Sequence, residues 1–274
     1  MNLYQNRIVI KVGTSTLTNE AGNNNLRSFD RLACVLSDVR NMGYEVILVS
    51  SGAIAAGSNK LHMLQRPASM RHKQAAAAVG QCALMILYNK FFCDYDKTIA
   101  QILLNAEDIE HEEKKENLIN TFDTLLEMGV IPIVNENDSV SYTEIESEGR
   151  LFGDNDMLSA VVAVLCRAKM LVILSDIDGF YDKDPRLYPH AKLIGKISQI
   201  DESVYALAGG AGSRRGTGGM KTKIKAAELA TAQGINTTIT NGNNPAALYE
   251  ILKGNSVGTL FTGKQSPPLL IGSK

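Results

Sequence analysis

The sequence lacks the residues that would mark several common classes of protein. Its 274 residues contain no tryptophan, four cysteines and four histidines. The cysteines form no Cys-x-x-Cys pair and have no histidine at ligand spacing, which argues against a zinc site or a disulfide framework. The formal net charge is −1, from 28 basic and 29 acidic residues. No basic surplus therefore favours nucleic acid or a membrane surface as a partner.

Long apolar runs and a leader segment are also missing. Uninterrupted apolar runs such as Leu171–Leu174 are far shorter than the roughly 20 residues that cross a bilayer. Residues 1–7 lack the charged head and apolar centre of a secretory signal. With 45% hydrophobic residues, the chain has enough apolar surface for a substantial core. These features predict a cytoplasmic globular protein.

Short β-rich runs alternate with longer helical patterns, which is typical of a parallel sheet wrapped in helices. Strands are predicted over residues 7–12, 45–50, 98–104, 130–134, 170–175, 236–240 and 257–261. Helices are predicted over residues 28–42, 69–93, 116–128, 157–168, 201–208, 220–233 and 245–253. Gly80 is a possible interruption of the second helix, and residues 139–152 are interpreted as a polar hairpin or flap.

A glycine-rich loop, Gly216-Thr-Gly-Gly-Met-Lys-Thr-Lys223, precedes an alanine-rich helical pattern. Glycines let backbone N–H groups surround an anion, and a helix turns its positive end toward it. The loop is not a Walker A motif, because Met220 precedes Lys221-Thr222. It is not a dinucleotide fingerprint either, because Arg215 stands where the third glycine would fall. Alone, the loop is better explained as a flexible helix cap.

Polar segments follow several predicted strands, where ligands bind in sheets of this kind. These segments are Lys11-Val-Gly-Thr-Ser15, Ser50-Ser-Gly-Ala53, Asn135-Glu-Asn-Asp138 and Ser175-Asp176. Asn135–Asp138 alone is better explained as an Asx turn, and Asp184-Pro-Arg186 as mostly structural. Lys11 and Lys223 together would bring two cations to one edge of the sheet. Phosphoryl transfer needs such positive charge, with little covalent chemistry from the protein.

Five segments, taken in order, resemble the glutamate 5-kinase branch of the amino acid kinase family. They are Lys11–Ser15, Ser51–Gly57, Asn135–Asp138, Gly153–Asp156 and Gly216–Lys223. Each segment is weakly specific alone, but five in this order, spread over nearly the whole chain, are highly specific.

The resemblance implies an α/β fold, a three-layer αβα sandwich around a mostly parallel central sheet. It implies one kinase domain over residues 1–262, with an acceptor-binding lobe over about 1–170 and a nucleotide-binding lobe over about 171–262. Residues 263–274 would form a short tail, without the PUA domain that many members carry.

The activity implied is ATP-dependent phosphorylation of the γ-carboxylate of L-glutamate to γ-glutamyl phosphate, the first step of proline biosynthesis. The catalytic residues would be Lys11 and Lys223, on the transferring phosphoryl group, and Asp156, which would organise both lysines. Glutamate would be bound by Ser51, Gly52, Ala53, Asp138 and Asn155. The nucleotide would be bound by Lys11, Ser175, Asp176, Thr217, Gly218, Gly219, Met220, Lys221, Thr222 and Lys223. Ser175 departs from the threonine that members often carry, but keeps the hydroxyl.

The chemistry of the residues agrees with this activity. A glutamate carboxylate has a pKa of about 4.3 and is ionised at pH 7, so its attack requires no general base. Asp138 suits the substrate's ammonium group, which would be costly to bury unpaired. No residue is assigned as a direct metal ligand, and Asp154 is at most a contributor to substrate or Mg²⁺ organisation. Asp154 or Asn155 could equally be a helix cap.

The resemblance further implies Mg²⁺, a homodimer or homotetramer, feedback inhibition by proline, and hand-off of the labile product to a glutamyl phosphate reductase. Three alternatives remain. The first is a sibling kinase that acts on N-acetylglutamate, aspartate, carbamate or UMP. The second is a non-catalytic proline or glutamate sensor, against which Lys11, Asp156 and Lys223 argue. The third is an RNA-binding module, which lacks a basic patch.

Overall fold

The computed structural model describes residues 6–19, 22–63, 65, 67–140, 154–208 and 219–264. Within them, eight strands form one sheet in the order β3-β4-β2-β1-β5-β7-β8-β6. The strands are β1 (Arg7–Val12), β2 (Glu45–Val49), β3 (Ile99–Leu104), β4 (Ile131–Glu136), β5 (Met170–Ser175), β6 (Lys196–Ile197), β7 (Asn236–Asn241) and β8 (Thr259–Phe261). β1 lies between β2 and β5 and pairs in parallel with both. Among the described strands only β7 and β8 pair antiparallel, so the sheet is mostly parallel, as predicted.

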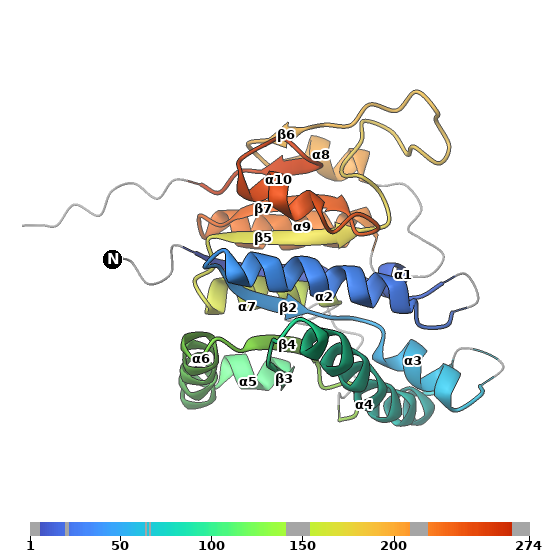
Figure 1. Cartoon of the computed structure of the whole chain (residues 1–274). Coiled ribbons are helices and arrows are strands. Elements are labelled where there is room, and N and C mark those ends of the chain that lie inside the picture. The colour runs from blue at the N-terminus through green and yellow to red at the C-terminus, as the bar shows by residue number, and fades with distance from the viewer. Residues whose placement is uncertain are drawn as a thin grey trace, which may run out of the picture.

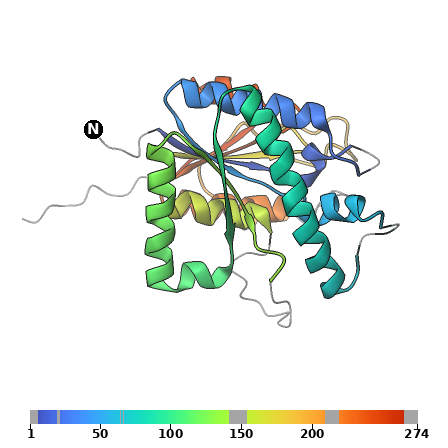
Figure 2. The ribbon, with the colours of Figure 1, turned by 60° about the horizontal axis from the view of Figure 1, so that its bottom comes forward.

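Helices cover both faces of the sheet (Figures 1 and 2). They are α1 (Thr14–Leu17), α2 (Leu26–Asn41), α3 (Ala53–Lys60), α4 (Met70–Asp94), α5 (Ala106–Glu110), α6 (Glu112–Glu127), α7 (Asn155–Leu165), α8 (Glu202–Leu207), α9 (Met220–Ala232) and α10 (Ala247–Leu252). One apolar cluster joins one face of the sheet to α6, α7 and α9, and a second joins the other face to α2, α4 and α10. The predicted αβα sandwich is confirmed.

The central strand shows how alternation sorts side chains between the two faces. Ile8 and Ile10 belong to the cluster under α2, whereas Val9 belongs to the cluster under α7. Successive strand residues point to opposite faces, so Lys11 shares the face of Val9. Lys11 therefore lies on the side of the sheet that α7 and α9 cover.

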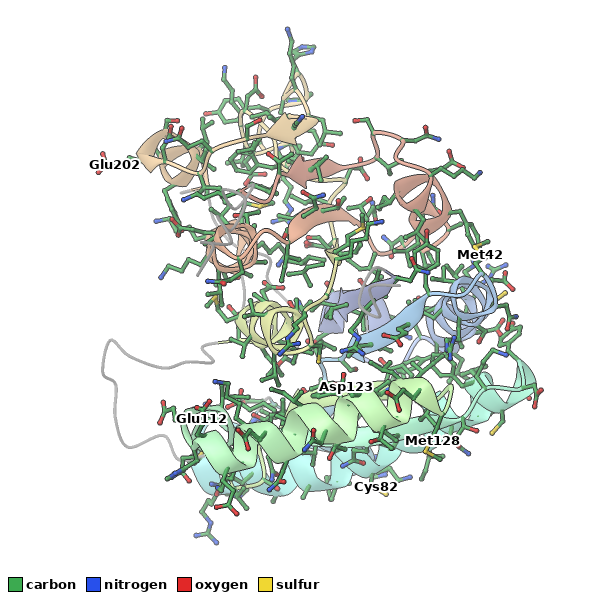
Figure 3. All side chains as sticks on the ribbon, turned by 90° about the vertical axis from the view of Figure 1, so that its left-hand side faces the viewer. Met42, Cys82, Glu112, Asp123, Met128 and Glu202 are labelled. Atoms are coloured by element: carbon green, nitrogen blue, oxygen red, sulfur yellow. The ribbon has the colours of Figure 1, made fainter. Side chains whose placement is uncertain are left out.

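At the opposite end of β1, Arg7 anchors three elements. Its guanidinium lies 2.7 Å from the carboxylates of Glu45 and of Asp123, and it donates to the Cys166 carbonyl at 2.8 Å. Asp123 lies on the side of α6 that faces the strands (Figure 3). Although burial opposes its charge, these acidic partners raise the pKa of Arg7 above its ordinary value. The pairs tie α6 and the end of α7 to β1 and β2.

Several elements differ from the sequence predictions. Gly80 does not interrupt α4. Its role is instead to let α4 approach the backbone of α3 closely. A Cβ at Gly80 would lie 1.7 Å from the Ala53 carbonyl oxygen, and one at Gly57 would lie 1.8 Å from the Ala76 carbonyl oxygen. The small-residue segment Gly52–Gly57 was not predicted to be helical, yet it forms most of α3. Its small side chains let the two helices pack backbone to backbone.

Other differences are smaller. The short elements α1, α5 and β6 were not predicted, and α6 begins at Glu112 rather than at residue 116. Asn105 and Asp108 form a capping box at the start of α5, a signal that the sequence carries. Most of the predicted flap, the loop 209–218 and the tail from residue 265 lie outside the described residues.

One helix among the described residues is long and apolar enough to cross a membrane, judged by length and composition only. This helix is α4, and the sequence analysis, which weighed uninterrupted apolar runs, did not identify it. A core helix can pass the same test, and Leu84, Tyr88 and Phe92 of α4 are buried in the core. The apolar composition of α4 is therefore explained in part by its packing against the sheet.

Candidate active site

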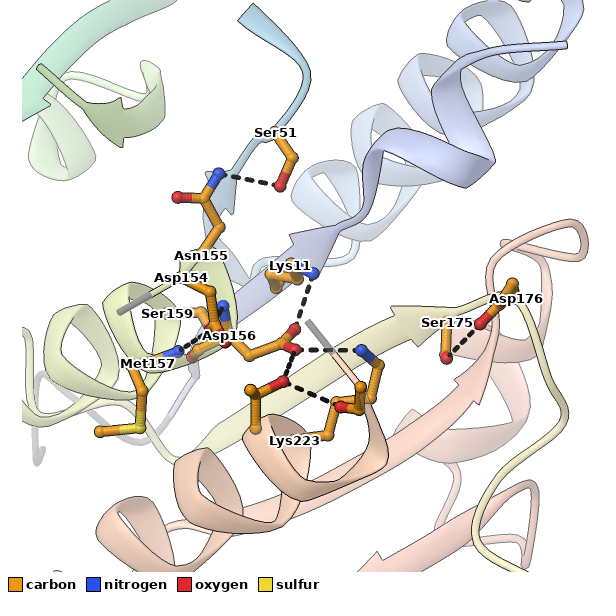
Figure 4. A network of polar contacts seen from close by, with 12 residues as sticks. Lys11, Ser51, Asp154, Asn155, Asp156, Met157, Ser159, Ser175, Asp176 and Lys223 are labelled. Atoms are coloured by element: carbon orange, nitrogen blue, oxygen red, sulfur yellow. Dashed lines mark hydrogen bonds and ion pairs between the residues drawn. The ribbon is translucent and has the colours of Figure 1, made fainter. Parts of the chain in front are cut away.

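Three charged side chains from three elements meet beside β1 (Figure 4). Lys11 of β1 places its Nζ 2.6 Å from Oδ1 of Asp156, and Lys223 of α9 places its Nζ 3.0 Å from Oδ2. All three side chains are buried, with Asp156 only 1% exposed. The structure therefore brings together the three residues predicted to be catalytic.

Local structure explains how the three side chains converge. Asp154 is the N-cap of α7 and accepts hydrogen bonds from the backbone N–H groups of Asp156 and Met157. The cap fixes Asp156 in the first turn of α7, and Lys223 lies in the first turns of α9. The two helices begin close together, and both turn their positive ends toward the site.

The electrostatics of this group are unusual for a protein interior. Burial would raise the pKa of Asp156, but Lys11 and Lys223 outweigh burial and hold this pKa below its ordinary value. One carboxylate faces two ammonium groups, so the three side chains carry a net charge of +1. Buried charge is costly unless it is paired. The group is thus suited to receive an anion.

Thr222 links the segment predicted to bind the nucleotide to Asp156. Its Oγ1 lies 2.9 Å from Oδ2 of Asp156 and 2.8 Å from the carbonyl oxygen of Gly219. Met220, Lys221 and Thr222 form the first turn of α9, and the side chain of Lys221 is exposed. Gly153, Thr217 and Gly218 lie outside the described residues.

A second group of polar side chains lies on the β2 side of Asp156. Nδ2 of Asn155 lies 2.8 Å from Oγ of Ser51, 2.8 Å from the carbonyl oxygen of Ser50 and 3.1 Å from Oδ1 of Asn135. Ser51 accepts through its oxygen and keeps its own proton to donate. The structure therefore places two predicted acceptor-binding residues, Ser51 and Asn155, in contact.

Two of the three remaining residues predicted to bind the acceptor, Ala53 and Asp138, border a cavity. Gly52 adopts φ 97°, a conformation that favours glycine, and its carbonyl accepts the first bond of α3. Ala53 and Asp138 line a cavity of about 880 Å³ between α4, β3 and the turn after β4. Burial raises the pKa of Asp138, and no positive partner at the described residues offsets that cost. An ammonium group in the cavity would stabilise its ionised form.

Ser175 and Asp176 lie at the end of β5, beyond Lys223 (Figure 4). Ser175 donates to Oδ1 of Asp176 at 3.2 Å, and Oδ2 of Asp176 lies 2.7 Å from the guanidinium of Arg186. The sequence analysis interpreted Arg186 as mostly structural, and the structure adds a charged contact with a predicted nucleotide-binding residue. No local sequence signal marks this contact, which joins a strand end to a loop ten residues later.

The acidic residues of the site bear on whether it could hold a metal ion. Among the described residues, no group of three or more His, Cys, Asp or Glu side chains could hold a metal ion. Asp156 is engaged by two lysines, and Oδ1 of Asp154 caps α7. Mg²⁺ commonly binds proteins through one or two carboxylates together with substrate phosphates. The described residues fit a metal that arrives with a nucleotide, but they do not form a cage of their own.

Comparison with known proteins adds independent information. The model of the amino acid kinase family matches residues 6–241. The chain is 54% identical over 259 residues to a glutamate 5-kinase of Clostridium perfringens (strain 13 / Type A), covering 94% of this chain and 96% of that protein. It is 50% identical over 255 residues to a glutamate 5-kinase of Enterococcus faecalis (strain ATCC 700802 / V583), covering 93% and 94%.

Solved structures with the same architecture are more distant in sequence. UMP kinase from Bacillus anthracis superposes with a TM-score of 0.64 at 15% identity, covering 96% of this chain and 98% of that one. Isopentenyl phosphate kinase from T. acidophilum superposes with a TM-score of 0.63 at 18% identity, covering 93% and 99%. At these identities the likeness concerns the fold alone.

Proposed function

The chain belongs to the amino acid kinase family, and we propose that within this family it is a glutamate 5-kinase. It transfers the γ-phosphoryl group of ATP to the γ-carboxylate of L-glutamate, forming γ-glutamyl phosphate and ADP in the first step of proline biosynthesis. The relatives from Clostridium perfringens and Enterococcus faecalis that carry this name match nearly the full length of the chain, at 54% and 50% identity. Other acceptors, a sensor and an RNA-binding module have no comparable support.

The observation that carries the proposal is the sharing of one buried carboxylate by two buried lysines. Asp156 contacts both Lys11 and Lys223, and the positive charge left over has no anionic partner among the described residues. A transferring phosphoryl group carries negative charge on its oxygens and would supply that partner. Asp156 then acts by orienting the two ammonium groups.

The reaction needs no proton transfer from the protein. The γ-carboxylate is ionised at pH 7, and one of its oxygens attacks the γ-phosphorus. The new O–P bond forms as the bond from phosphorus to the β,γ-bridging oxygen breaks, and the electron pair leaves with ADP. Lys11 and Lys223 stabilise the charge on the phosphoryl oxygens, which is the main contribution that such enzymes make.

The acceptor is held on the β2 side of the phosphoryl group. Ser51, Asn155 and the N–H groups at Gly52 and Ala53 receive a carboxylate, and Asp138 pairs with the ammonium group. Holding both reactants in line can contribute about 7–11 kcal/mol to the barrier reduction. N-acetylglutamate offers no ammonium group to Asp138, so the same site discriminates against it.

The nucleotide is held by residues from the second part of the chain. Ser175, Asp176 and the segment Thr217–Lys223 bind ATP, with Lys11 reaching it from β1. Residues from about 1 to 170 form the acceptor-binding lobe, and residues from about 171 to 262 form the nucleotide-binding lobe. Mg²⁺ bound together with ATP would neutralise part of the phosphate charge.

Further properties of the family belong to the same proposal. The protein acts in the cytoplasm as a homodimer or homotetramer, is inhibited by proline at the acceptor site, and passes its labile product to a glutamyl phosphate reductase. These statements rest on the family resemblance and not on particular contacts.

Hydroxylamine trapping tests the reaction. Incubation with ATP, Mg²⁺ and L-glutamate is expected to yield γ-glutamyl hydroxamate together with ADP, because an acyl phosphate reacts with hydroxylamine. Parallel assays with N-acetylglutamate, aspartate, carbamate and UMP are expected to release little ADP. Robust turnover of N-acetylglutamate with none of glutamate would overturn the proposal.

A further inference from the structure

The acceptor-binding residues are supported from behind by α4. Gln81 and Tyr88 of this helix are seven residues apart, or about two turns, so they lie on one face. Each reaches a different part of the acceptor site through a hydrogen bond. We propose that Gln81 and Tyr88 are positioning residues that hold the acceptor site in its binding geometry, an inference that rests on the proposed function.

The first contact sets the orientation of an amide. Oε1 of Gln81 accepts a hydrogen bond from Nδ2 of Asn135 at 2.9 Å. Asn135 is 1% exposed, and its Oδ1 accepts from the Glu136 backbone N–H and lies 3.1 Å from Nδ2 of Asn155. An amide oxygen accepts and an amide nitrogen donates, so the orientation of one amide in such a network fixes the next.

Loss of the Gln81 oxygen would remove one determinant of this orientation. A flipped Asn135 amide would present its NH₂ group to the NH₂ group of Asn155, and two donors cannot pair. Asn155 would then turn, and the contact with Ser51 would weaken. Gln81 also lines the cavity together with Ala53 and Asp138, so its support is local to the acceptor.

The second contact fixes the segment between β2 and α3. The hydroxyl of Tyr88 lies 2.8 Å from Oγ of Ser50, and Ser50 donates to the Ser51 carbonyl at 3.3 Å. Tyr88 is 1% exposed, and burial raises the pKa of its hydroxyl, which therefore remains protonated. With Tyr88 as donor to Ser50, both hydroxyl protons in this series of hydrogen bonds have an acceptor. The Ser50 carbonyl, which Asn155 contacts, is held in place.

The two contacts converge on Asn155 from opposite sides. Gln81 acts through the Asn135 side chain, and Tyr88 acts through the backbone of Ser50. Among the described residues, neither side chain forms a hydrogen bond or an ion pair with Lys11, Asp156 or Lys223. Their loss should therefore weaken acceptor binding while leaving nucleotide binding intact.

Steady-state kinetics on Gln81→Met, Tyr88→Phe and the double variant test the inference. Both substitutions keep side-chain bulk and remove only hydrogen-bonding atoms. Each is expected to raise KM for glutamate about 3- to 10-fold, the range for one hydrogen bond, and to leave KM for ATP within about twofold. Gln81→Glu keeps an acceptor oxygen, so it should raise KM for glutamate less than Gln81→Met does.

Cys93→Ala is the matched control, because Cys93 is exposed on the same helix and does not line the cavity. It should leave both KM values unchanged. Thermal unfolding of each variant shows whether the fold is intact. If Tyr88→Phe is unstable, the kinetics of Gln81→Met alone test the inference. An unchanged KM for glutamate in Gln81→Met and in the double variant would overturn the inference. Absence of hydroxamate from the unaltered protein would instead overturn the proposed function.

Discussion

Lys223→Ala is expected to lower kcat by about 10²–10³-fold, the cost of removing one preorganised charge from a transition state. The ammonium group of Lys223 contributes because it stabilises the negative charge on the phosphoryl oxygens in the transition state. At an effective dielectric near 20, a unit charge about 4 Å away is worth roughly 4 kcal/mol. Lys11→Ala should have a similar effect, because Lys11 contacts the other oxygen of the same carboxylate.

The fold should survive Lys223→Ala, since Asp156 keeps Lys11 and Thr222 as partners. Lys225→Ala is the matched control, because Lys225 is exposed on α9 and lies outside the proposed nucleotide-binding segment. It should change kcat much less. Initial rates with saturating ATP and glutamate measure the effect. A loss confined to KM for glutamate, with kcat unchanged, would contradict the role assigned to Lys223.

Gly80→Ala is expected to destabilise the protein by about 1–3 kcal/mol or more, as overpacking of a tight contact does. The added methyl would lie 1.7 Å from the Ala53 carbonyl oxygen and 2.5 Å from the Gly57 nitrogen. Backbone atoms cannot move aside as a flexible side chain can, so α3 must shift. The gain in helix propensity, about 1 kcal/mol, is too small to offset this cost.

The same shift should also raise KM for glutamate, because α3 begins at Gly52 and Ala53. Urea unfolding measures the stability, and Cys82→Ala is the matched control at an exposed position on α4. That control should stay within about 0.5 kcal/mol of the unaltered protein. A Gly80→Ala variant as stable as the unaltered protein would show that α3 and α4 do not pack as closely as described.

The alternation of strands and helices was enough to predict the layered fold, because the central strands β1, β2 and β5 carry apolar runs. The same pattern also placed Lys11 at the end of a strand and Lys223 at the start of a helix. Their contact with Asp156 was predicted only through the family resemblance, since 145 residues of sequence separate Lys11 from Asp156. The roles of these residues stay predictions until the variants are measured.

Other features could not be predicted because they depend on contacts between distant segments. Gly80 resembled a helix breaker in the sequence, and only the position of α3 shows why glycine is needed there. Gln81 contacts a residue 54 positions away, and Tyr88 contacts one 38 positions away. Both read as ordinary residues of an apolar helix. Neither local propensity nor spacing carries information about such partners.

The measurement that tests the central claim most directly uses L-glutamate labelled with ¹⁸O in its γ-carboxylate. Attack of this carboxylate on the γ-phosphorus of ATP places a labelled oxygen in the acyl phosphate bridge. Hydroxylamine then breaks the carbon–oxygen bond, and the released phosphate is expected to carry one ¹⁸O, visible as an isotope shift in ³¹P NMR. Lys223→Ala should form this labelled phosphate far more slowly. Release of unlabelled phosphate alone would contradict transfer to the glutamate carboxylate at this site.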